Sequence, residues 1–251
     1  MKWQKIRSIS NIDFDSDIIV VYGRFQLEMQ DWFCTLLTEK ELNYYSKFRN
    51  KTALQCRAVL RLILAEYCHT LPHEIDIRTT SKGKPFLADN ALNFNVSHTN
   101  SAYIIVLSRS GRVGVDMEQL SGNEDFEAMA DYAFSDFEKH QLKASTSKET
   151  EFETIWTLKE AFLKALGVGL TTKLNQINVY EKLTGYQLNH LTFICPGGET
   201  GSLVANGNLH SITFRYIFHH LFHFQPKPFR LQNLHIVAKW EQFLSEIEGW
   251  F

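Results

Sequence analysis

The strongest structural signal in this sequence is an apolar stripe on one long predicted helix, which runs from Glu151 to Leu166. Apolar residues recur every three or four positions along it and therefore share one helix face, the buried side. Gly167 follows directly, where a helix C-cap belongs. The stripe consists of Phe152, Ile155, Trp156, Phe162, Leu163 and Leu166.

Helical and strand patterns follow a similar coarse order in the two halves of the chain. In the first half we expect a strand over 17–22, a helix over 51–69 and strands over 74–80, 92–96, 103–107 and 113–118. In the second half, outside the long helix, we expect a helix over 123–144, a loop over 145–150, strands over 177–181, 191–195 and 212–217, and a terminal helix over 239–247. The order predicts an α+β fold of two similar lobes, 1–110 and 111–251, which meet near Gly111.

Composition excludes several classes of protein. Of the 251 residues, 44% are hydrophobic and 22% are charged, as in ordinary globular proteins. A net charge of −2 without a basic stripe argues against a nucleic-acid partner. The four cysteines form no Cys-x-x-Cys pair, and neither a signal peptide nor a run of about 18 apolar residues is present. We therefore expect a reduced, cytoplasmic protein that does not contact membranes.

Two carboxylates share one face of the strand predicted over 113–118. Side chains alternate along a strand, so Asp116 and Glu118 project together while Val115 and Met117 point to the apolar side. The two carboxylates are then about 6–7 Å apart, which suits a hard cation such as Mg²⁺. The alternative is a pair of solvated surface carboxylates.

The long helix carries two lysines and a glutamate in a suggestive order. Lys159 lies three residues from both Trp156 and Phe162, on the apolar stripe, so its ammonium must reach an anion or extend to water. Glu160 and Lys164 form an i, i+4 pair one step round the helix. The alternative for this pair is an ordinary surface ion pair.

A third group of polar residues stands where a strand ends. Ser97 and His98 offer a hydroxyl, an imidazole and free backbone N–H groups, which can hold a phosphate oxygen. A serine-hydrolase interpretation fails, because the chain has no Gly-x-Ser-x-Gly motif. Upstream, Lys82 and Lys84 flank Gly83 in a turn that could be no more than an exposed loop.

Taken in order, five separated motifs resemble the surfactin-synthetase-type 4′-phosphopantetheinyl transferases. The resemblance covers residues 82–170 and implies two similar α+β lobes related by a pseudo-two-fold axis, each a small mainly antiparallel sheet packed against helices. It also implies a monomer that binds coenzyme A and Mg²⁺ between the lobes. The motifs are Gly83-Lys84-Pro85, Phe94 to His98, Gly114 to Glu118, Phe134-Ser135, and Trp156 to Lys164 followed by Gly167 to Leu170.

The resemblance implies a role for each matching residue. The activity would be that of a holo-[acyl-carrier-protein] synthase, which moves 4′-phosphopantetheine from coenzyme A to a serine of an apo acyl or peptidyl carrier protein. Asp116, Glu118 and Glu160 would bind the metal; Ser97 and His98 would contact coenzyme A phosphates; Lys84 would lie near the adenine nucleotide; Lys159 and Lys164 would face the pyrophosphate. Catalysis would rest on Glu160, Lys164 and His98, with Glu138 as a second candidate base.

Other parts of the chain depart from the family pattern. The group that holds the coenzyme A 3′-phosphate is left open among Lys47, Arg49, Lys51, Arg57 and Arg61. His219, His220 and His223 could be read as a metal site, but packed or surface histidines explain them better, since no carboxylate or cysteine lies nearby. Two alternatives stay open: a degenerate protein that binds coenzyme A or a carrier without turnover, and an unrelated Mg²⁺-dependent phosphodiesterase.

Overall fold

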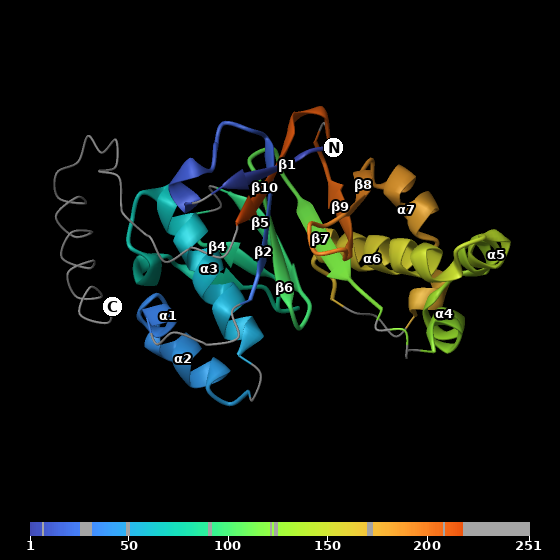
Figure 1. The fold of residues 1–251 in the computed structure, drawn as a ribbon, viewed down its shortest axis with the longest axis horizontal. Helices are drawn as coiled ribbons and strands as arrows, with labels where there is room; N and C mark the ends of the chain where they lie inside the picture. The colour runs from blue at the N-terminus through green and yellow to red at the C-terminus, as the bar shows by residue number, and fades with distance from the viewer. Residues whose placement is uncertain are drawn as a thin grey trace.

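The computed structural model describes residues 1–6, 8–25, 32–48, 51–89, 92–120, 122, 125–169, 173–207 and 209–217. In these residues the fold is α+β, as predicted, with small, mostly antiparallel sheets and helices on either side of them (Figure 1). No helix in the described part of the chain is long and apolar enough to cross a membrane. The predicted helix over 239–247, the three histidines at 219, 220 and 223, and Arg49 lie outside the described residues.

The largest sheet has five strands in the order β1-β10-β2-β6-β5. β2 pairs antiparallel with β6, and β6 with β5, whereas β10 pairs parallel with both β1 and β2. A strand from late in the chain therefore lies within the sheet of the N-terminal half. The strands are β1 (Trp3–Ile6), β2 (Ile18–Arg24), β5 (Asn93–His98), β6 (Ala102–Ser108) and β10 (Ile212–Ile217).

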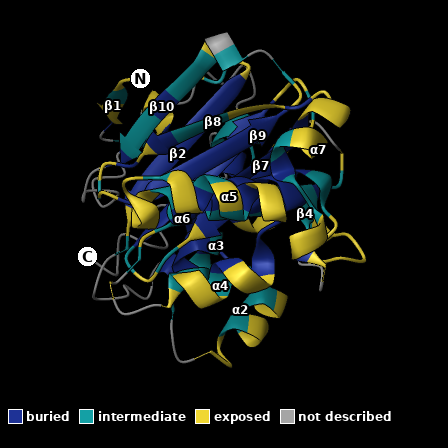
Figure 2. Cartoon of the chain, turned by 90° about the vertical axis from the view of Figure 1, so that its right-hand side faces the viewer, coloured by how far each residue is buried: buried dark blue, intermediate teal, exposed yellow. Residues whose placement is uncertain are grey.

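A second, antiparallel sheet has the order β7-β9-β8, and a two-stranded sheet joins β3 to β4. The three-stranded sheet packs face to face against the five-stranded one, with apolar residues of β2 and β6 opposite those of β7 and β9. Figure 2 shows β2, β7 and β9 in the buried colour, behind helices that carry exposed residues. The strands are β7 (Val113–Glu118), β8 (Asn189–Ile194), β9 (Thr200–Ala205), β3 (Ile77–Thr79) and β4 (Pro85–Leu87).

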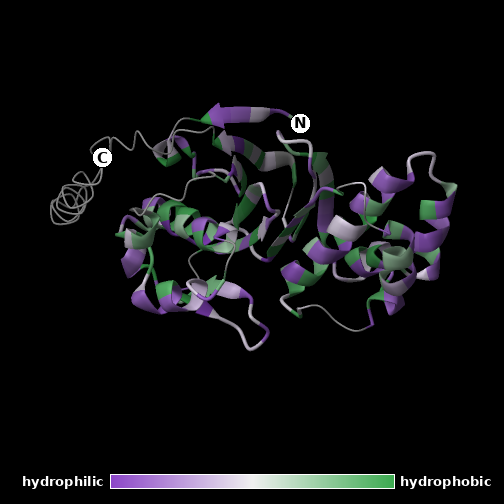
Figure 3. Ribbon diagram, turned by 60° about the horizontal axis from the view of Figure 1, so that its bottom comes forward, coloured by the Kyte–Doolittle hydropathy of each residue, from purple (hydrophilic) through white to green (hydrophobic). Residues whose placement is uncertain are grey.

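The helices form two groups on opposite sides of the sheets (Figure 1). The group containing α3 covers the outer face of the five-stranded sheet, and the group containing α6 packs on the three-stranded sheet. Hydrophilic and hydrophobic residues alternate along both groups in Figure 3. The α-helices are α1 (Trp32–Thr35), α2 (Glu39–Tyr45), α3 (Thr52–Cys68), α4 (Phe126–Ala133), α5 (Asp136–Ala144), α6 (Lys148–Leu166) and α7 (Val179–Gly185). Short 3₁₀ helices occur at Ile9–Asn11, Pro72–Glu74, Leu174–Gln176 and Leu209–Ser211.

Most of the predicted elements are confirmed, with three corrections. The helix expected over 123–144 is two helices, because Ser135 starts α5 as an N-cap in a capping box with Glu138. The loop expected over 145–150 is shorter, since α6 begins at Lys148. The strand expected over 177–181 is wrong: Asn178 caps α7 there. The strands β1, β4 and β9 were not anticipated.

Alternate residues along each strand pack into two different hydrophobic clusters, one on each side of the sheet. In β2, Ile19 and Val21 point toward α3, while Ile18 and Val20 point toward the other sheet. In β7, Val115 and Met117 face the five-stranded sheet, as predicted. Gly114, Asp116 and Glu118 therefore face α6. The lobe boundary predicted near residue 110 stays a prediction.

Gly114 lets β7 and α6 approach more closely than any other residue would allow. A Cβ atom built at Gly114 would lie 2.1 Å from the carbonyl oxygen of Ala161 and 2.3 Å from the amide nitrogen of Ala165. Both are backbone atoms of α6, so neither can swing away. Gly167, with φ of 71°, ends α6 in the left-handed conformation predicted for it.

We expect Gly114→Ala to destabilise the protein by at least about 3 kcal/mol, because the added methyl group overlaps backbone that has no room to move. The free energy of unfolding from urea titration measures this. Gly185→Ala is the matched control: nothing described lies within 4 Å of the added atom, and the residue is helical. It should lose nothing and could gain up to about 1 kcal/mol. Equal stability of the two variants would contradict the close approach of α6 to β7.

Candidate active site

The candidate active site lies where α6 crosses the polar face of β7. β7 contributes Asp116 and Glu118, and α6 contributes Glu160 and Lys164, which lie one turn apart. Ser97 joins them from the end of β5, next to β7. Residues from both halves of the chain therefore meet at one place.

Asp116 is the centre of this group. It is only 3% exposed, and its Oδ1 accepts hydrogen bonds from the Lys164 ammonium at 2.5 Å and from the Ser97 hydroxyl at 2.8 Å. The same ammonium also donates to the Ser97 hydroxyl oxygen at 3.2 Å. Asp116 Oδ2 is buried and has no hydrogen-bond partner among the described residues. A buried carboxylate oxygen without a hydrogen-bond partner lowers the stability of the fold, and a bound cation would satisfy it.

The carboxylates at this site influence one another. Burial raises the pKa of Glu118 to about 7, with the charge of Asp116 as the second cause and that of Glu160 contributing further. Burial and the charge of Asp116 also raise the pKa of Glu160. Lys164 opposes both shifts. The site therefore gathers more negative charge than its one ammonium balances, and an added cation would stabilise it.

The residues fit a divalent metal ion by their chemistry, although they are not arranged as a finished metal site. No group of three or more His, Cys, Asp and Glu side chains is placed to hold a metal within the described ranges. Lys164 contacts Asp116 directly instead. The orphaned Oδ2 of Asp116, beside two further carboxylates, nevertheless supplies the hard oxygen donors that Mg²⁺ prefers.

His98 lines a neighbouring hollow. It is exposed, and its ring packs edge-on to Phe25 with the centroids 6.1 Å apart. The hollow has a volume of about 130 Å³ and separates the end of β5 from α3. Its lining consists of Tyr45, Ala53, Cys56, Arg57, Leu60, Pro85, Val96 and His98. It thus combines aromatic and apolar walls with an imidazole and a guanidinium.

The two arginines of α3 that were candidates for phosphate binding, Arg57 and Arg61, differ in their partners. Arg61 is 2% exposed, and its guanidinium donates to Glu41 and to the carbonyl oxygens of Pro72 and Ile75. Arg57 shares Glu41 but borders the hollow. Burial alone would raise the pKa of Glu41, yet Arg61 and Arg57 lower it to about 2. Arg61 is therefore committed to the fold, and Arg57 is the arginine beside the hollow.

Lys159 does not join the Asp116 group. Its ammonium donates to Glu138 Oε2 at 2.6 Å and to the carbonyl oxygen of Ile177 at 2.5 Å, with the Lys159 and Glu138 side chains 3% and 0% exposed. Glu138 also accepts from the amides of Ser135 and Val179. The prediction that this lysine needs an anion is confirmed, but the anion is Glu138, which ties α5 and α7 to α6.

Lys84 also has a different environment from the one predicted. Its ammonium donates to the carbonyl oxygens of Val113 at 3.1 Å, Lys164 at 2.7 Å and Ala165 at 3.0 Å. It therefore reaches from the turn before β4 to the C-terminal end of α6. The structure joins Ser97, Asp116 and Lys164 by hydrogen bonds, and the charges of Glu118 and Glu160 interact with Asp116. Lys159 and Lys84 bind other groups.

Two residues that support the site escaped the sequence analysis. Glu153 accepts hydrogen bonds from the Leu120 amide at 2.8 Å and from the Thr200 hydroxyl at 2.6 Å, and so holds the segment after Glu118. Asn95 is buried, and its Oδ1 accepts from the Val115 amide at 3.0 Å, which joins β5 to β7. Asn95 lies within the Phe94 to His98 motif and on the same strand face as Ser97, and these were the signals available for it.

Two models of one enzyme family match this chain. The model of the 4′-phosphopantetheinyl transferase superfamily matches residues 112–199, and that of the 4′-phosphopantetheinyl transferase N-terminal region matches residues 29–110. The 4′-phosphopantetheinyl transferase HetI of Nostoc sp. is 30% identical over 161 residues, which cover 61% of this chain and 68% of HetI. The chain therefore belongs to the 4′-phosphopantetheinyl transferase family. The surfactin-synthetase-type subclass stays a prediction.

Other relatives extend the similarity beyond one group of organisms. A Synechocystis sp. protein that carries the name of a 4′-phosphopantetheinyl transferase is 36% identical over 139 residues, 53% of this chain and 56% of that protein. The human L-aminoadipate-semialdehyde dehydrogenase-phosphopantetheinyl transferase is 28% identical over 141 residues, 51% of this chain and 46% of that protein. The chain thus spans about half the length of these two relatives.

We expect Lys159→Met to lower the free energy of unfolding by about 3–5 kcal/mol, because it leaves the Glu138 carboxylate buried without its cation. Adding Glu138→Gln should recover part of the loss, since it removes the unpaired charge. Urea titration measures both, and Lys182→Met, at an exposed position on α7, is the control with a change within about 0.5 kcal/mol. A fully stable Lys159→Met protein with weakened coenzyme A binding would instead show that this ammonium faces the ligand.

Proposed function

We propose that this chain is an Mg²⁺-dependent holo-[acyl-carrier-protein] synthase, which transfers 4′-phosphopantetheine from coenzyme A to a serine of an apo acyl or peptidyl carrier protein. Family membership supports the reaction class. The observation that carries the proposal is Asp116, buried with one oxygen unpartnered among the described residues and charge-coupled to Glu118 and Glu160 beside the Lys164 ammonium.

Asp116, Glu118 and Glu160 are the residues we assign to the metal ion. When bound, Mg²⁺ would neutralise negative charge on the pyrophosphate as its P–O bond breaks. The chain's own contribution to the same task is Lys164, whose ammonium lies between Asp116 and Ser97. Metal binding to Asp116 would leave that ammonium free to donate to phosphate oxygens.

The hollow beside His98 is the place we assign to the nucleotide end of coenzyme A. Tyr45 and Pro85 supply flat and apolar walls for a base, and Arg57 and His98 supply donors for phosphate. Of the four described basic residues considered for the 3′-phosphate, Arg57 fits best because it borders the hollow, whereas Arg61 is buried on other partners. Ser97 and His98 would then contact the phosphates between the two ends of the site.

The reaction that these residues would carry out is a phosphoryl transfer. The carrier serine loses its proton, its oxygen bonds to the β-phosphorus of coenzyme A, and 3′,5′-adenosine bisphosphate leaves with the electron pair of the broken P–O bond. Glu160 is the carboxylate we assign to orient or deprotonate the serine. Glu138 is no longer a candidate base, because it is fully buried and bonded to Lys159 and two amides. A cytoplasmic, monomeric enzyme remains our expectation.

Intact-mass spectrometry of an apo acyl carrier protein tests the reaction directly. Incubation with this protein, coenzyme A and Mg²⁺ should add about 340 Da, one phosphopantetheine arm, and EDTA should abolish the gain because the metal is removed. Excess Mg²⁺ added back should restore it. No gain on fatty-acid, polyketide and peptide carriers, despite measurable coenzyme A binding, would instead identify a binding protein without turnover.

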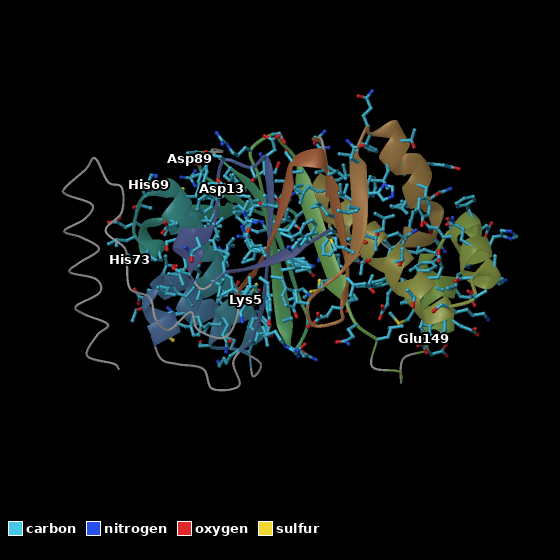
Figure 4. All side chains as sticks on the ribbon, turned by 45° about the horizontal axis from the view of Figure 1, so that its top comes forward. Lys5, Asp13, His69, His73, Asp89 and Glu149 are labelled. Atoms are coloured by element: carbon cyan, nitrogen blue, oxygen red, sulfur yellow. The ribbon has the colours of Figure 1, made fainter. Side chains whose placement is uncertain are left out.

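Asp116→Ala and Glu160→Ala should each lower turnover at least about 100-fold, the scale for losing a metal ligand or a catalytic carboxylate. Circular dichroism should show that both variants remain folded. Glu149→Ala is the matched control on the same helix; this exposed residue lies at the outer edge of the molecule in Figure 4 and should leave turnover unchanged. A near-normal rate for either site variant would mean that the metal site is assigned to the wrong residues.

A further inference from the structure

Lys84 makes a contact that none of its predicted roles explains. Its side chain leaves the turn before β4, in the first half of the chain, and its partly buried ammonium ends among three backbone carbonyl oxygens of the second half. An ammonium has three N–H donors, and the three carbonyl oxygens match them in number. No donor is left over for a ligand while this arrangement holds.

The three carbonyl oxygens belong to the two elements that build the candidate active site. Lys164 and Ala165 lie in the last turn of α6, where carbonyl groups lack the i+4 amide partner found inside a helix and the helix dipole is negative. Val113 is the first residue of β7. One cation therefore ties the end of α6 to the start of β7, three residues before Asp116.

The bonds to Lys164 reach the candidate site through a single residue. Its backbone oxygen accepts from Lys84 at 2.7 Å, while its side-chain ammonium donates to Asp116 at 2.5 Å. Gly167 supports the same turn, because its amide donates to the carbonyl oxygens of Leu163 and Lys164. A Cβ atom at Gly167 would lie 3.0 Å from Lys84 Cδ, so the lysine stem packs directly on this helix end.

The electrostatics of Lys84 are consistent with a charged ammonium that is fixed by its three carbonyl partners. The pKa of Lys84 is lowered to about 8, mainly by burial and secondly by the charge of nearby Arg112. The group therefore remains largely protonated at neutral pH, where it can donate all three hydrogen bonds. The carbonyl groups and the negative helix end balance its charge without a carboxylate.

We propose that Lys84 is a positioning residue for phosphopantetheinyl transfer: it fixes the end of α6 on β7 so that Lys164 stands beside Asp116, and it does not bind the adenine nucleotide. This inference rests on the proposed function for its kinetic part. Its structural part, the tie between α6 and β7, can be tested on the protein without substrate.

The first test separates binding from turnover. Lys84→Met should lower kcat about 10- to 100-fold, the range for losing a residue that orients a catalytic group, while KM and Kd for coenzyme A change less than about threefold. Lys84→Arg, which keeps the cation and its donors, should recover most of kcat. Lys82→Met, an exposed lysine on the same turn, is the control and should match wild type. A raised Kd for coenzyme A with unchanged kcat would overturn the proposal.

A double-variant cycle then asks whether Lys84 acts through Lys164. If it does, Lys84→Met should cost less than about threefold in kcat when it is added to a Lys164→Met variant, because the group to be positioned is gone. If the fold losses in kcat of the two single variants instead multiply in the double variant, Lys84 acts independently of Lys164 and the proposal is overturned.

Amide hydrogen exchange of the protein without ligand provides a readout that needs no turnover and no fully stable variant. Lys84→Met, or the milder Lys84→Arg, should raise exchange in the last turn of α6 and leave that of α3 unchanged. Unchanged exchange in α6 would overturn the positioning role. If wild-type protein transfers nothing but α6 responds in this way, the proposed function fails while the tie between α6 and β7 stands.

Discussion

The close approach of α6 to β7 at Gly114 is the constraint on which the candidate site depends. With no side chain at Gly114, the helix backbone lies against the strand, and the same strand face presents Asp116 and Glu118 to the helix. The side chains of Glu160 and Lys164 on α6 are therefore close to the carboxylates of β7. Asn95 and Lys84, both from the first half of the chain, hold β7 and the end of α6 in that relation.

Two lysines on α6 show how burial decides between structure and chemistry. Lys159 is almost completely buried, and Glu138, two amides and one carbonyl group complete a closed network around it. Lys164, five residues later, remains partly exposed and meets a carboxylate whose second oxygen is unpartnered among the described residues. The first arrangement satisfies its polar groups within the protein, whereas the second leaves one buried carboxylate oxygen unsatisfied by the described residues.

Local patterns predicted the elements that carry the site but not the partners of their side chains. β7 begins and ends where alternation placed it, and Gly167 ends α6 as expected. The family resemblance implied that Ser97, Asp116 and Lys164 belong to one site, and in the structure Asp116 accepts hydrogen bonds from the other two. The resemblance did not anticipate the carbonyl partners of Lys84 or the Glu138 partner of Lys159, because a motif identifies a residue type but not the buried group that its side chain reaches. β9 was missed because its buried residues, such as Gly201 and Ser202, lack a strong strand composition.

The position of β10 also constrains the order in which this protein can form. β10 separates β1 from β2 and pairs with both, although more than 180 residues lie between β2 and β10 in the chain. During synthesis from the N-terminus, β1 and β2 therefore have to wait for a strand that is made much later. Contacts so distant in sequence are slow to form, and until β10 arrives an edge of β2 lacks its partner. The five-stranded sheet is thus completed only after residues 212–217 have been made.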